Sequence, residues 1–178
     1  MKRWAYFIAS LLLLTTATRL CTAKGPYAEN EVIARIYELV CSQYRYRPVI
    51  VQKTVTLGEF LTEEVMTNPG FDKVALADLA KSSQKERVLT IDKKLPSMAS
   101  WERYFAGDAP TTREWKKFVQ AYPKKNACLV FASPGFNKPM QTSVVYCEIR
   151  SCYTMTSFLA EIKQGKIVRL QEQFVADW

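Results

Sequence analysis

Four strand-like runs follow Pro123, and this pattern restricts the fold more than any other feature of the chain. They read ACLVFAS, TSVVYCEI, YTMTSFLAEIK and KIVRLQEQFV, and β-branched and aromatic residues are frequent in them. Their connections are short, and the tightest one is built around Gly165. Because short connections join antiparallel neighbours, the sequence predicts a C-terminal antiparallel β-meander of about four strands.

Two amphipathic patterns earlier in the chain indicate helices. Apolar residues recur at helical spacing over residues 29–44. A second pattern begins after Asp72, a residue type that is suited to the N-cap position of a helix. In this second helix we expect Val74, Ala77 and Leu79 to face the core.

A third helix is predicted over residues 111–122, where Thr111 and Glu114 have the spacing of a capping box and Pro123 ends the pattern. A β-branched run at 49–55 is typical of a strand. Helices early in the chain and a meander late predict an α+β fold. We expect the N-terminal and central helices to pack on one face of the C-terminal sheet.

Residues 1–23 have the layout of a secretory signal peptide: a basic start, a short apolar stretch and a region of small residues. The apolar stretch is too short to span a bilayer. We therefore expect removal of 1–23 and a single α+β domain over 24–178, with no membrane span in the mature chain. Two alternatives are a buried N-terminal helix and a lipoprotein modified at Cys21. The lipoprotein is disfavoured because Arg19 and Leu20 stand where small residues are expected.

The charge and the lack of histidine limit the function. The chain has 25 Lys and Arg, 17 Asp and Glu, and no histidine. Removal of residues 1–23 lowers the formal net charge of +8 by three, because they contain three cations and no acid. So small a positive excess is more typical of a soluble protein than of one that binds nucleic acid. Without imidazole there is no Ser-His-Asp or Cys-His nucleophile and no imidazole metal site. We expect no metal, no cofactor and no nucleic acid.

Carboxylates are the remaining candidates for catalysis. Glu148 and Glu161 lie on neighbouring predicted strands and could approach each other, although outward-facing polar residues are the simpler interpretation. The alternative to a binding function is therefore a histidine-free, carboxylate-dependent hydrolase of the cell envelope.

Four cysteines remain after removal of the leader: Cys41, Cys128, Cys147 and Cys152. An even number in an exported chain suggests two disulfides, although free buried cysteine is also common. The candidate bridges are Cys147–Cys152, across a hairpin tip, and Cys41–Cys128, between the first helix and the sheet. Four cysteines allow three connectivities, which spacing alone leaves open.

The segment SPGFNKPM, residues 133–140, separates the first two predicted strands. A pairing of Cys128 with Cys147 would centre a hairpin turn on this segment. Gly135 and Asn137 are the residue types that tolerate a positive φ there, and Phe136 could cover the edge of the core. The structural interpretation is therefore a hairpin connection.

The functional interpretation is that this rigid loop presents Phe136, Asn137 and Lys138 to a partner, because binding residues are frequent on ordered loops. A second binding candidate is QYRYRP, where Tyr44 and Tyr46 alternate with arginines in a pattern that can stack on sugars or bases. The plainer explanation of the arginines is a favourable position beyond the C-terminus of a helix.

A resemblance to a known family rests on three short motifs: Tyr122-Pro123, the S-x-x-G-F-N motif of Ser133 to Asn137, and Val145-Tyr146. In this arrangement the chain resembles a family of uncharacterised exported bacterial proteins. The next hairpin departs from the family, because it reads CEIRSCYTMT and lacks the glycines of many relatives. The resemblance implies export and a shared fold, and it implies no activity. With the residue-level observations it predicts a periplasmic or secreted, non-catalytic interaction protein whose partner is another envelope or secreted protein.

Overall fold

The computed structural model describes residues 29–58, 63, 66–67, 69–107 and 109–177. The predicted signal peptide and Cys21 lie outside the described residues. Within these ranges, no helix combines the length and the apolar character that a membrane span requires.

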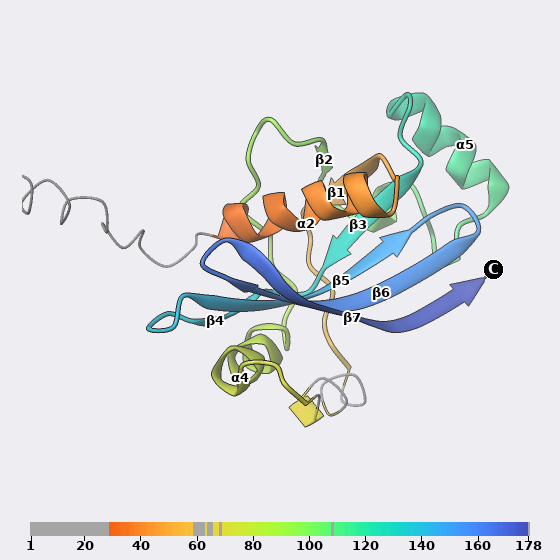
Figure 1. The fold of residues 1–178 in the computed structure, drawn as a ribbon. Coiled ribbons are helices and arrows are strands. Elements are labelled where there is room, and N and C mark those ends of the chain that lie inside the picture. The colour runs from red at the N-terminus through yellow and green to blue at the C-terminus, as the bar shows by residue number, and fades with distance from the viewer. Residues whose placement is uncertain (1–28, 59–62, 64–65, 68, 108, 178) are drawn as a thin grey trace, which may run out of the picture.

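A mixed sheet forms the centre of the fold (Figure 1), and among the described residues it has seven strands in the order β2-β1-β3-β5-β6-β7, with β4 paired to β5. Their bounds are β1 Pro48–Val51, β2 Ser97–Met98, β3 Ala127–Phe131, β4 Gly135–Asn137, β5 Thr142–Arg150, β6 Thr154–Lys163 and β7 Lys166–Asp177. The predicted meander is confirmed as β3, β5, β6 and β7, which pair antiparallel.

The sheet is larger than the predicted four strands because β1 pairs parallel with β3, and β2 pairs parallel with β1. All four residues of β1 are buried, so its uninterrupted apolar sequence PVIV suits a strand that is covered on both faces. This strand is shorter than the predicted run 49–55.

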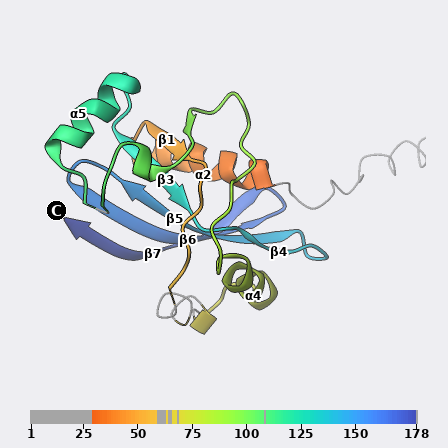
Figure 2. The ribbon, with the colours of Figure 1, turned by 180° about the vertical axis from the view of Figure 1, so that it is seen from behind.

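The helices are α2 Glu29–Gln43, α4 Lys73–Ser82 and α5 Thr112–Ala121, with a short 3₁₀ turn, η2, at Trp101–Arg103. They cover both faces of the sheet, and the prediction of a single covered face is wrong. Figures 1 and 2 show α2 and α4 on opposite sides of the strands. The two faces hold separate cores because alternate residues of each strand point in opposite directions. One face holds the α2-side core, and the other face holds the α4-side and α5-side cores. Each core is named after the helix that covers it.

Local capping signals place two of the helices as predicted. The Asp72 carboxylate accepts hydrogen bonds from the amides of Val74 and Ala75, both at 3.0 Å, at the start of α4. At the start of α5, Thr111 and Glu114 form both halves of a capping box. Each device satisfies backbone amides that have no partner within the helix.

The inward face of α4 agrees with the prediction at Leu79 and differs from it at Val74 and Ala77. Ala75, Leu76 and Leu79 are buried, whereas Val74 is 59% exposed and Ala77 is exposed. The spacing of apolar residues in α4 leaves more than one face that could be buried. The face that is buried is the one that contacts β4, where Gly135 lies against Ala75 and Leu79.

The hairpin register also differs from the prediction. Cys147 pairs with Phe131, and Cys128 pairs with Arg150, so the two cysteines are not opposite each other. Part of the supposed loop forms β4, which pairs with the start of β5. The turn itself spans 138–141, and its left-handed residue is Gln141, with φ 49°, instead of Asn137.

Candidate functional site

The four cysteines are not bridged. Cys128 belongs to the α5-side core, whereas Cys41 is on α2 at the opposite face, so the sheet separates them. Cys147 pairs with Phe131 and Phe158 inside the sheet, whereas Cys152 lies in the turn beyond β5. Neither candidate bridge is therefore formed. Burial raises the pKa of the Cys128 and Cys147 thiols, which keeps them protonated and poor as nucleophiles.

The S-x-x-G-F-N motif contacts helix α4 through its last three residues. A Cβ on Gly135 would lie 2.1 Å from the carbonyl oxygen of Ala75, so only glycine permits this approach. The amide of Phe136 donates to the Asp78 carboxylate at 2.8 Å. The side-chain nitrogen of Asn137 lies 2.9 and 3.1 Å from the two carboxylate oxygens of Asp72.

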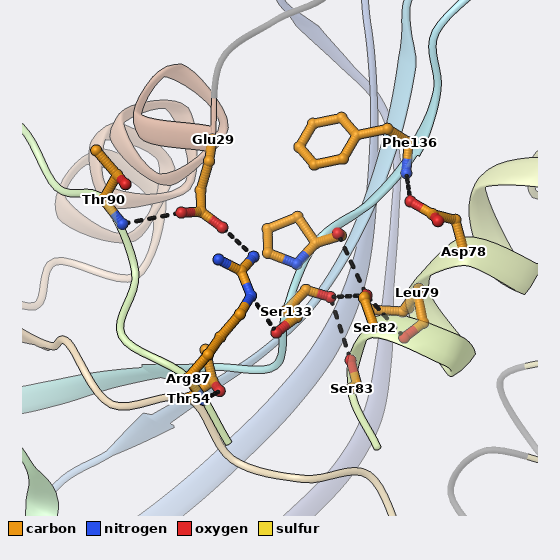
Figure 3. A network of polar contacts seen from close by, with 11 residues as sticks. Glu29, Thr54, Asp78, Leu79, Ser82, Ser83, Arg87, Thr90, Ser133 and Phe136 are labelled. Carbon is orange, nitrogen blue, oxygen red and sulfur yellow. Dashed lines mark hydrogen bonds and ion pairs between the residues drawn. The ribbon is translucent and has the colours of Figure 1, made fainter. Parts of the chain in front are cut away.

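Ser133, the first residue of the motif, is the centre of a polar network (Figure 3). Its carbonyl oxygen accepts from the Ser83 hydroxyl at 3.1 Å, and its own hydroxyl accepts from Nε of Arg87 at 2.8 Å. Nη2 of Arg87 donates to the Glu29 carboxylate at the start of α2, which also accepts from the amide of Thr90 at 2.8 Å. The motif thus joins the start of α2, the end of α4 and the segment that follows α4.

The three loop residues predicted to bind a partner occupy different environments. Phe136 is half-buried and packs against the α2-side core, and Asn137 is 8% exposed. Lys138 is exposed in the turn. The structure thus brings only Lys138 fully to the surface.

Two opposite charges are buried on β5. Nε and Nη2 of Arg150 both donate to Oε2 of Glu148 at 2.7 Å, and the Tyr146 hydroxyl donates to Oε1 of Glu148 at 3.1 Å. The Arg150 guanidinium also lies 4.8 Å from the centre of the Trp101 ring. The Glu148 carboxylate therefore has partners for both oxygens, and the pair is typical of a structural ion pair.

The second candidate carboxylate, Glu161, is distant from Glu148. Glu148 pairs with Ser157 and Glu161 pairs with Val144, so the backbone positions of the two glutamates are four residues, about 13 Å, apart along the sheet. Oε2 of Glu161 accepts from the amide of Asp72 at 2.8 Å. A carboxylate pair in a glycoside hydrolase is separated by about 5–10 Å, so this spacing does not suit that chemistry.

An open cleft of about 430 Å³ lies between the C-terminus of α2 and β7, and we call it the α2–β7 cleft. Gln43, Tyr44, Leu170 and Glu172 line it. The Tyr44 hydroxyl donates to Glu172 at 3.1 Å, and its ring lies parallel to Phe158 with 6.0 Å between centroids. Burial, followed by the neighbouring Glu172, raises the pKa of Tyr44 to about 12. The cleft presents an aromatic ring, an amide and a carboxylate together.

Sequence reasoning identified only part of this cleft. Tyr44 was a predicted binding residue, and it lines the cleft. Tyr46 is half-buried, packs on the α2-side core and is not among the lining residues. Leu170 and Glu172 come from β7, and no pattern near Tyr44 points to them.

The described residues include no group of three or more His, Cys, Asp or Glu side chains that could hold a metal ion. Comparison of the chain with protein-family models, with curated proteins and with solved structures finds no match.

Proposed function

We propose that the protein is an exported, non-catalytic binding module, and that the α2–β7 cleft contacts a second envelope or secreted protein. One observation carries this proposal: Tyr44, on the connection after α2, and Glu172, on β7, meet in an open cleft. Tyrosine is enriched among the residues that dominate protein–protein binding energy, because it combines a large rigid ring with a polar group.

The chemistry of the cleft suits a cationic or hydrogen-bond-donating segment. Glu172 accepts from Tyr44 through Oε1, so its Oε2 can accept from a Lys, an Arg or a hydroxyl of the partner. Gln43 is exposed and offers both a donor and an acceptor. Leu170 supplies an apolar floor that is half-buried against the α2-side core.

The arrangement of the buried carboxylates supports a binding function over the hydrolase alternative. Glu148 is held by Arg150 and Tyr146, and Glu161 is held by the backbone of Asp72. A general acid or base must reach a substrate atom directly or through one water, and both carboxylates are at least nine-tenths buried.

Site-specific photocrosslinking tests the cleft. A photoreactive phenylalanine analogue replaces Gln43 in one variant and Lys93, an exposed loop residue, in a control. We expect the variant at Gln43 to give one discrete adduct with another exported protein and the control to give none. Adding Glu172→Lys should abolish the adduct while the circular dichroism spectrum stays unchanged. An adduct that survives this change, or no adduct at all, would refute the cleft as the contact site.

Export is tested separately by intact mass. We expect the protein recovered outside the cytoplasm to begin at Lys24, after removal of 1–23. Retention of Met1 in a cytoplasmic protein would refute export. It would not decide whether the α2–β7 cleft binds a partner, which the crosslinking experiment tests separately.

A further inference from the structure

A group of exposed cations lies along α5, just after it, and on the connection between α2 and β1. All of its members are exposed, and we call them the basic face: Arg45, Arg47, Arg113, Lys116, Lys117 and Lys124. They come from two segments of the chain that are distant in sequence.

Hydrogen bonds hold these two segments together. The amide of Arg47 donates to Oδ1 of Asn126 at 2.7 Å, and the amide of Asn126 donates to the carbonyl oxygen of Arg47 at 3.3 Å. Figures 1 and 2 both show the connection after α2 beside the chain that leads from α5 into β3. The connection that carries Arg45 and Arg47 therefore lies beside the chain that leaves α5.

Negative charge is scarce in the two segments of the chain that carry these cations. Residues 39–58 and 115–147 contain no Asp or Glu. Glu114, the acid of α5, accepts from the amide and hydroxyl of Thr111 and from the amide of Ala106, and of the six cations it interacts electrostatically with Lys117. Among the described residues, the ion pairs involve other cations. The basic face thus has a positive charge that an external partner can neutralise.

Aromatic rings border the basic face. Phe118 is the buried residue of α5, whereas Trp115 and Tyr122 are half-buried and pack at the edge of the α5-side core. Tryptophan and tyrosine are favoured at the boundary between lipid and water, because the ring is apolar and its edge is polar. The two clefts at the C-terminus of α2 and beside the β6–β7 turn are lined by other residues.

We infer that the basic face binds the surface of a bilayer that contains anionic phospholipids. Lysine and arginine near such a surface are attracted by its negative potential, and half-exposed aromatic rings fit the headgroup level. A bilayer surface can accommodate both the cations and the half-buried aromatic rings, whereas an acidic polymer would use the cations alone. The contact is peripheral, and it is independent of the α2–β7 cleft.

Vesicle co-sedimentation tests this inference. The purified protein is mixed with vesicles of phosphatidylcholine alone, or of equal parts phosphatidylcholine and phosphatidylglycerol. We expect binding only to the anionic vesicles, and weaker binding as salt increases. The double variant Lys116→Gln/Lys117→Gln should reduce partitioning about 30-fold. The matched control, Lys93→Gln/Lys94→Gln, removes the same charge from an exposed loop and should leave partitioning unchanged.

Three results would overturn the inference. Equal binding to both kinds of vesicle would show that apolar insertion, not charge, drives the binding. A signal peptide that remained attached would contribute equally to every variant compared. Equal loss in the two double variants would show dependence on net charge alone. Binding of heparin without binding of anionic vesicles, lost in Lys116→Gln/Lys117→Gln, would assign the basic face to an acidic polymer.

Discussion

The side-chain nitrogen of Asn137 lies 2.9 Å from one carboxylate oxygen of Asp72 and 3.1 Å from the other. The same carboxylate caps α4 by accepting from the amides of Val74 and Ala75. A single acidic side chain therefore both starts the helix and fixes it to β4. Through this contact, the segment that the sequence also suggested as a binding loop has a structural role, because it fixes β4 to the start of α4.

Asn137→Ala should lower the free energy of unfolding by about 1–2 kcal/mol, because the part-buried Asp72 carboxylate loses its side-chain donor. Urea denaturation at neutral pH measures this change. Lys138→Ala, at the next and exposed position, is the control and should change stability by less than about 0.5 kcal/mol. A loss of equal size in both variants would contradict the role of Asn137.

Gly135→Ala should destabilise the protein more than Asn137→Ala. The new Cβ would lie 2.1 Å from the carbonyl oxygen of Ala75 and 2.2 Å from the amide nitrogen of Leu79, and both are backbone atoms of α4. Helix and strand must separate to accommodate it, and we expect a loss of about 3 kcal/mol or more. Thermal unfolding compares it with Gly107→Ala, where a Cβ has no neighbour within 4 Å. Similar unfolding temperatures would show that α4 adjusts without cost.

Some of these features could be predicted because their causes are local. The cap at Asp72 and the capping box of Thr111 and Glu114 involve residues within one helical turn, so spacing alone reveals them. The meander was predictable for the same reason, because its connections are short.

Other features depend on contacts between distant residues. The parallel pairing of β1 with β3 places Val49 beside Cys128, and no local pattern encodes a parallel neighbour. The register of Cys147 differs from the prediction because β4 forms within the supposed loop. The cleft partner of Tyr44 is Glu172, 128 residues away. The alternating tyrosines and arginines therefore indicated the side of the cleft that contains Tyr44, but not the side that β7 provides.

The buried ion pair on β5 gives a third prediction. Arg150→Met removes the cation that holds Glu148, whose side chain is 9% exposed, and should cost about 3–5 kcal/mol. The double variant Glu148→Gln/Arg150→Met removes both charges and should recover most of this loss, since the amide oxygen introduced by Glu148→Gln can still accept from Tyr146. Urea denaturation of the single and double variants provides the comparison. Equal losses would attribute the effect to lost packing on Trp101 instead of to an unpaired charge.

The raised pKa of Tyr44 predicts a loss of stability at alkaline pH. Burial and Glu172 raise this pKa from 10.0 to about 12, so the folded state favours the neutral phenol. The stabilisation linked to this group is complete below pH 10 and is lost as the pH rises from about 10 to about 12. Tyr44→Phe has no phenol to ionise, and its stability should fall less over the same interval.

Urea denaturation of both proteins at a series of pH values measures the difference. At neutral pH the wild type should be the more stable, because Tyr44→Phe loses the hydrogen bond to Glu172. This advantage should shrink as the pH rises from about 10 to about 12, and an ultraviolet titration should show one tyrosinate step near 12 missing from the variant. A stability difference that stays constant over this interval would mean that Tyr44 ionises alike in the folded and unfolded chains. The cleft would then not hold its phenol in the neutral form.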